Sequence, residues 1–185
     1  MRSNKSGKEF LNKGQNNFKA HLPYFITSGL VLSFIFSLIG SFFLHESLIQ
    51  TTLFKIDGMF AITAFACMAS KLTSDGYDIP SAGFNVLAIA QGLFLAEIDQ
   101  ANSWNYSTQS TGVLFMIPAL IMIAYYDRFP KWVRYGGIFS VIPFVVLFIV
   151  RTYVGTQNTI DFEIIIFLIY QAVTLCWAWQ VWKNK

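Results

Sequence analysis

Six acidic residues gather toward one end of the apolar segments of this 185-residue chain. Asp57 stands deepest, about two helical turns inside its apolar segment. An ionisable side chain in such a place is costly, so it is a candidate for function by default. Carboxylates bind cations, accept hydrogen bonds and exchange protons. The six acids are Glu46, Asp57, Glu97, Asp99, Asp161 and Glu163, and the basic residues near them are Lys55 and Arg151.

The last apolar segment carries polar residues at helical spacing. Residues three, four and seven apart are neighbours on one helix face, so Glu163, Phe167, Tyr170, Gln171 and Thr174 share a face. That face is polar for a membrane span, and we expect it to point into a bundle. An earlier segment adds two amides, Asn85 and Gln91. The full predicted polar cluster or pore lining consists of Asp57, Glu97, Asp161, Glu163, Lys55, Arg151, Asn85, Gln91, Tyr170 and Gln171.

Three interpretations of this cluster remain open. In the first, Lys55 or Arg151 pairs with an acid and ties the outer helix ends together. In the second, the acids form an outward-facing vestibule that attracts cations or admits a small polar solute. In the third, a buried carboxylate such as Asp57 couples to protons or takes part in catalysis.

Enzymatic and metal-binding motifs do not appear in the sequence. It has no Gly-rich phosphate loop, no H-E-x-x-H and no G-x-S-x-G. His21 and His45 fall at opposite ends of the first apolar segment, and Cys67 and Cys176 lack the spacing of a metal site. We therefore expect a non-enzymatic protein with no catalytic residues, no metal and no cofactor.

The composition indicates which elements position these side chains. Hydrophobic residues make up 55% of the chain and charged residues 12%, against roughly a quarter charged in soluble domains. Soluble enzymes, disordered tails, disulfide-rich modules and nucleic-acid binders are excluded. Apolar stretches near the length of a membrane helix predict an all-α bundle of six transmembrane helices, at about 23–44, 49–70, 81–98, 112–126, 135–151 and 161–182.

The basic residues predict the orientation of this bundle. The chain has thirteen Lys and Arg residues. All of them except Lys55 and Arg151 fall in the first 22 residues, in two alternate loops and at the C-terminus. Cytoplasmic loops carry such an excess, so both termini should be cytoplasmic. The predicted organisation is a basic N-terminal segment over 1–22, the six-helix domain over 23–182 and a short tail over 183–185.

Other residue types predict how the helices pack. Small residues at four-residue spacing allow close helix contact in lipid, and two such seams consist of Gly29, Ser33, Ser37 and Ser41, and of Ala88, Gly92 and Ala96. Pro118 and Pro143 predict kinks. Trp177, Trp179 and Trp182 are typical of an aromatic belt at the membrane boundary, as are Tyr125, Tyr126, Trp132 and Tyr135.

Two short stretches repeat or resemble known patterns. Tyr77-Asp78-Ile79-Pro80 and Tyr126-Asp127-Arg128-Phe129-Pro130 are similar turns before similar helices. Lys71-Leu72-Thr73 before Ser81–Asn85, with Thr111–Phe115, resembles parts of the six-helix urea and amide channels. That resemblance requires an extra first helix here and leaves no counterpart of their last one, so no channel residues are carried over.

We expect a multi-pass protein of a cell membrane, with the bacterial inner membrane as the setting. Its predicted function is a small channel or carrier for an ion or small polar solute with an acidic outer vestibule. The alternative is a membrane scaffold or effector subunit, for example in a defence or stress system, that docks a soluble cytoplasmic protein through its basic face. The expected partners are the lipid bilayer and further copies of the chain, and not nucleic acid.

Overall fold

The structure is a computed structural model, and its described part is helical and free of strands. It describes the backbone of residues 4–43, 47–97, 106–154 and 160–184, and the side chains of 20–43, 47–96, 111–150, 153 and 165–184. The helices are α1 (Asn4–Gly40), α2 (Leu48–Ser74), α3 (Asp78–Glu97), α4 (Tyr106–Ala124), α5 (Lys131–Phe139), α6 (Val141–Val154) and α7 (Ile160–Lys183).

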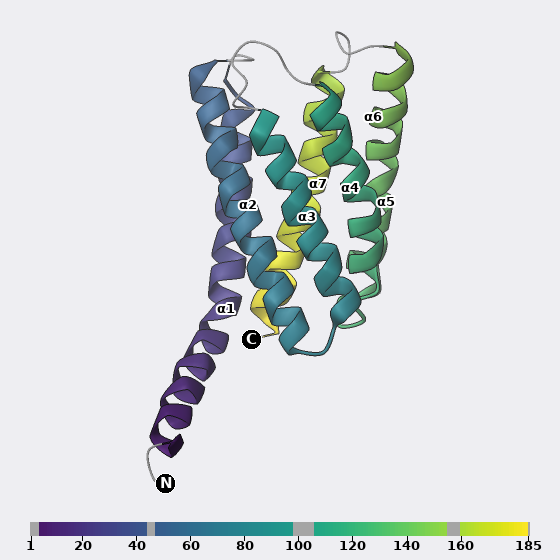
Figure 1. The fold of residues 1–185 in the computed structure, drawn as a ribbon. Helices are drawn as coiled ribbons and strands as arrows, with labels where there is room; N and C mark the ends of the chain where they lie inside the picture. Colours follow the sequence, from purple (N-terminus) through teal and green to yellow (C-terminus); the bar gives the residue numbers. More distant parts are fainter. Residues whose placement is uncertain (1–3, 44–46, 98–105, 155–159, 185) are drawn as a thin grey trace.

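Figure 1 shows the helices side by side, and the contacts between them form a closed ring in chain order. α1 packs on α2, α2 on α3, and α3 on α4; α4 then contacts α5 and α6, and α7 closes the ring against α5, α6 and α1. The start of α1 and the end of α7 lie at the same end of the bundle, and α1 projects beyond it. This arrangement directs one face of every helix toward a common interior.

Within the described residues, five segments are long and apolar enough to cross a membrane. These are Ala20–Gly40, Leu48–Ser74, Asp78–Ala96, Lys131–Val150 and Ile165–Lys183, and Thr111–Ala124 is a shorter apolar helix. The chain is therefore helical with several apolar segments suited to a multi-pass membrane protein. The count of six spans and the cytoplasmic location of the termini stay predictions.

The turn between α2 and α3 has the geometry of a Schellman C-cap. Gly76 adopts a positive φ of 82°, a conformation that glycine reaches without steric cost. Its N–H donates to the Thr73 carbonyl at 3.1 Å, and the Tyr77 N–H donates to the Leu72 carbonyl at 2.9 Å. This turn fixes the position of Tyr77 at the end of the bundle.

The segment predicted as one fifth helix is divided into α5 and α6 at Ser140. Pro143 follows three residues later. A proline has no N–H to donate to the carbonyl four residues earlier, here that of Phe139, and its ring crowds that carbonyl. The Ser140 hydroxyl, at the division itself, donates to a different carbonyl, that of Gly137, at 2.7 Å. Pro118, in contrast, lies within the continuous helix α4.

The seam on α1 faces α2 closely. A Cβ atom added at Gly29 would meet the Ala64 Cβ at 2.9 Å, and Ser33 and Ser37 are buried on the same face. The seam expected on α3 differs, since a Cβ at Gly92 would meet nothing within 4 Å and Ala96 is exposed. The contact between α3 and α4 instead uses Gly83, whose added Cβ would meet the Ala119 carbonyl oxygen at 2.9 Å.

Trp177 belongs to the core and not to an aromatic belt, which corrects the expectation from sequence. It is 1% exposed, and its ring meets those of Phe84 at 5.2 Å and Phe65 at 6.5 Å between centroids. Trp179 and Trp182 are exposed, because two and five residues along a helix turn the side chain to another face. Tyr126 is likewise buried, since it packs between Tyr77 and Phe129.

Candidate functional site

A buried carboxyl on α2 is the centre of the candidate site. Asp57 is 5% exposed, and its Oδ1 accepts a hydrogen bond from the Ser33 hydroxyl of α1 at 2.5 Å. The Gln171 amide of α7 lies 3.5 Å from the same oxygen. The Ser37 hydroxyl, one turn beyond Ser33, is also beside the carboxyl. Two helices, α1 and α7, thus supply polar groups to one acid on α2.

These partners arise from local helix geometry. Ser33 and Ser37 are four residues apart, so they lie above one another on the face of α1 that packs on α2. Small side chains on this face let the two helices approach. Their hydroxyls are therefore carried to within hydrogen-bonding distance of Asp57.

Polar groups continue from Asp57 along α7. The Thr174 hydroxyl donates to the Gln171 backbone carbonyl at 2.8 Å and lies 3.2 Å from the Gln171 side-chain oxygen. Tyr170 is buried beside them, with its hydroxyl near the Gln91 amide of α3. In the described part of the chain, no group meets hydrogen-bond geometry for the Tyr170 hydroxyl. The interior therefore holds buried hydroxyl, amide and carboxyl groups from neighbouring helices.

The buried polar cluster is defined as the residues that meet in this interior. All of them are buried, and they come from four different helices. Buried polar groups in lipid are expensive unless they are satisfied or serve a function. The cluster consists of Ser33, Ser37, Asp57, Gln91, Tyr170, Gln171 and Thr174.

The structure separates some of the residues that the sequence grouped together. Asn85 is exposed on α3 and is not part of the cluster, because it stands six positions before Gln91, which corresponds to about 240° of rotation. Lys55 is half-buried, and two residues before Asp57 it points away by about 200°. The side chains of Glu97, Arg151, Asp161 and Glu163 lie outside the described residues.

No basic side chain of the described residues lies within 4 Å of the Asp57 carboxylate. The ion pair found within this part of the chain joins Lys71 and Asp75 at 2.7 Å, at the far end of α2. The described residues also contain no group of three His, Cys, Asp or Glu arranged for a metal ion. The acid is held by neutral donors.

A second group of contacting residues, Tyr77, Tyr126 and Arg128, lies at the end of the bundle near the α2–α3 turn and is not among the site residues predicted from the sequence. There the Tyr77 and Tyr126 rings meet edge to face at 4.8 Å, and Arg128 lies over the Tyr77 ring at 5.3 Å from its centroid. The signal that points to this cluster is the repeated Tyr-Asp turn, which contains both tyrosines.

Comparisons with protein-family models, with curated proteins and with solved structures find no match to this chain. The resemblance to urea and amide channels therefore rests on short motifs alone.

Proposed function

We propose that this protein is a small membrane carrier for a monovalent cation, in which Asp57 binds the proton or metal ion. The observation that carries the proposal is a buried carboxyl held by hydroxyl and amide groups, with no basic side chain of the described residues in reach. The proposal includes six membrane spans with both termini cytoplasmic, in a cell membrane.

The energetics of a buried acid support this role. An ionised carboxylate in an apolar interior is strongly disfavoured unless its charge is compensated. A bound proton removes the charge, and a bound alkali cation neutralises it with oxygen ligands close by. Ser33 and Ser37 offer such oxygens. Binding and release of a cation is then the natural change of state for this group.

The burial of Asp57 favours a carrier over an open channel. At 5% exposure the carboxyl is enclosed by α1, α2 and α7. Carriers hold their ion near the middle of the membrane and open to one side at a time. A relative movement of α1 and α7 against α2 would expose this group, because the contacts that enclose it come from those helices.

The decisive experiment measures cation flux into liposomes that contain the purified full chain. An imposed membrane potential drives uptake, and a pH dye inside the liposomes reports the uptake of protons. A second set of liposomes, in a buffer with Na⁺ in place of choline, reports the uptake of the metal ion. We expect Asp57→Asn to reduce the protein-dependent flux by about tenfold or more, because an amide neither takes up and releases a proton in this way nor supplies the negative charge that balances a bound cation.

The matched control is Asp127→Asn, which removes an exposed acid of the same type from the α4–α5 turn. It should keep the wild-type rate. Both variants must run as single species by size exclusion in detergent. Absence of flux of either ion through the wild type, or an Asp57→Asn rate equal to it, would overturn the carrier proposal.

A second candidate function has its own observation. α1 is 37 residues long, whereas its apolar span covers Ala20–Gly40, so the helix continues well beyond the bundle (Figure 1). This extension includes Lys5, Lys8, Lys13 and Lys19 in its sequence. A projecting basic helix suits the docking of an acidic surface on a soluble protein.

In the scaffold case, changing Lys5, Lys8 and Lys13 to Gln should release a partner that co-purifies from the native membrane. The control is Lys183→Gln, which removes a charge at the end of α7 on the same end of the bundle as the start of α1 and should retain the partner. A wild-type protein that purifies as a single species from that membrane argues against docking.

A further inference from the structure

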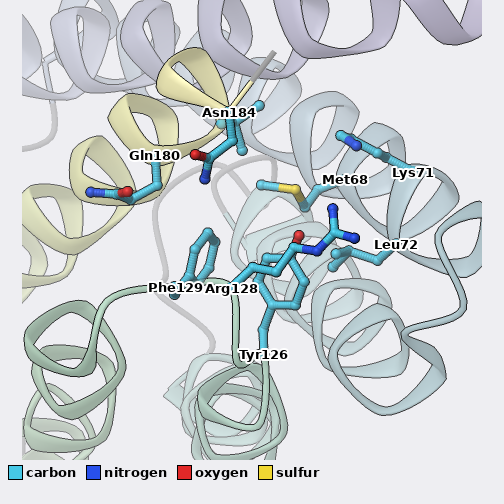
Figure 2. Close-up of a pocket in the computed structure, with 9 residues that line it drawn as sticks. Met68, Lys71, Leu72, Tyr126, Arg128, Phe129, Gln180 and Asn184 are labelled. Atoms are coloured by element: carbon cyan, nitrogen blue, oxygen red, sulfur yellow. The ribbon is translucent and has the colours of Figure 1, made fainter.

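A small pocket opens at the end of the bundle that carries the α2–α3 turn (Figure 2). Its volume is about 30 Å³, enough for one or two water molecules or for part of a larger group that enters from outside. α2, the α4–α5 turn and the end of α7 contribute its walls. It is lined by Met68, Lys71, Leu72, Tyr126, Arg128, Phe129, Gln180, Val181 and Asn184.

Arg128 is held in a defined orientation at this pocket. Its Nε donates to the Tyr77 hydroxyl at 3.0 Å, and its guanidinium lies over the Tyr77 ring. Tyr77 is itself fixed by the Tyr126 ring and by the glycine turn before it. Among the described residues, no hydrogen-bond partner is found for the two terminal nitrogens of Arg128. The planar guanidinium of Arg128 is therefore held in one orientation, with its two terminal nitrogens available to donate hydrogen bonds to a ligand.

The other polar groups of the pocket are also donors. Figure 2 shows Lys71 on the same side of the pocket as the Arg128 guanidinium, and Asn184 beside Gln180 across Met68 from it. Lys71 is bound to Asp75 at 2.7 Å, but an ammonium has three donors. Gln180 and Asn184 add side-chain amides from α7. Two cations and two amides surround an otherwise apolar floor of Met68, Leu72 and Phe129.

We propose that this pocket binds a phosphate group through Arg128, with Lys71 and Asn184 as further donors. Arginine matches the oxygens of phosphate with two parallel hydrogen bonds. Basic pockets between membrane helices at the headgroup level bind anionic lipid headgroups, and the pocket lies at the ends of α2 and α7. The phosphate is that of an anionic lipid or free inorganic phosphate. The site does not depend on what Asp57 carries.

The test measures the thermal unfolding midpoint of the full chain in a neutral detergent. One arm adds phosphatidylglycerol, with diacylglycerol of the same acyl chains as the phosphate-free comparison. The other arm adds inorganic phosphate, with chloride at the same ionic strength. A concentration-dependent rise with phosphatidylglycerol assigns the site to a lipid, and a rise with inorganic phosphate alone assigns it to the free anion; either outcome supports the pocket.

Three variants connect the binding to the geometry. Arg128→Gln should raise the half-saturating concentration about tenfold or more, because it removes the charge and the planar guanidinium. Tyr77→Phe keeps the ring but loses the hydroxyl that orients Arg128, so it should weaken binding by a smaller factor. Lys131 is an exposed basic residue at the same end of the bundle, and it does not line the pocket. Lys131→Gln should therefore leave binding unchanged.

Two results would overturn the proposal. One is a wild-type midpoint that neither phosphatidylglycerol nor inorganic phosphate raises above its matched comparison. The other is equal binding by Arg128→Gln and the wild type. Since Arg128 is exposed in a turn, its variant should fold, and size exclusion checks this before binding is measured.

Discussion

Trp177→Ala should lower the free energy of unfolding by about 3–5 kcal/mol, as expected for removing a large aromatic side chain from a packed core. Trp177 on α7 joins Phe65 of α2 and Phe84 of α3 by edge-to-face ring contacts. Its ring also reaches Gly137 of α5, at 4.0 Å from a Cβ built there. The Trp177 side chain therefore connects four helices of the bundle, α2, α3, α5 and α7, and its loss leaves a cavity between them.

The measurement is a titration of the purified protein from mild detergent into SDS, followed by circular dichroism or by gel mobility. The matched control is Trp179→Ala, two residues along the same helix, where the side chain is 62% exposed. That change should stay within about 0.5 kcal/mol of the wild type, as surface substitutions do. Similar losses for Trp177→Ala and Trp179→Ala would contradict the buried position of Trp177.

Gly29→Val should destabilise the protein by about 1–3 kcal/mol, the usual cost of adding atoms to a closely packed contact. The first added carbon would lie 2.9 Å from the Ala64 Cβ and 3.4 Å from the Phe60 carbonyl oxygen. α1 and α2 must then separate. Because Ser33 is one turn beyond Gly29, the separation also draws its hydroxyl away from Asp57, and we expect the flux through the protein to fall.

Gly92→Val is the control for Gly29→Val. It is the same substitution inside another helix, so the change in helix propensity is the same for both. A Cβ at Gly92 would meet nothing within 4 Å. Thermal unfolding in detergent should therefore distinguish the two variants. A Gly29→Val protein as stable as the wild type would mean that α1 and α2 are not in close contact at this position.

Much of the fold is determined locally and can be predicted from the sequence. The low charged fraction and the apolar segments indicate a helical membrane protein, and the described helices agree with that class. The ends of α2 follow from local chemistry as well: the Ser47 side chain accepts from the Gln50 N–H, and Gly76 adopts the positive φ that the turn requires.

The direction in which each side chain points is less predictable in such a chain. A soluble helix shows its buried face by the contrast of apolar and polar residues, but a helix in lipid is apolar on both faces. Spacing turns Trp179 away from Trp177 and Asn85 away from Gln91, but it does not tell which member of each pair faces the interior; in the structure these are Trp177 and Gln91.

Composition and the spacing of residues by themselves determined the helical class with several apolar segments, and Asp57 as a polar group inside one of them. Tertiary structure decided its partners. Ser33 is 24 residues away in sequence and Gln171 is 114 residues away, and they reach the same oxygen because α7 closes the ring beside α1. Spacing rules describe neighbours on one helix, whereas contacts between helices depend on how the whole bundle packs.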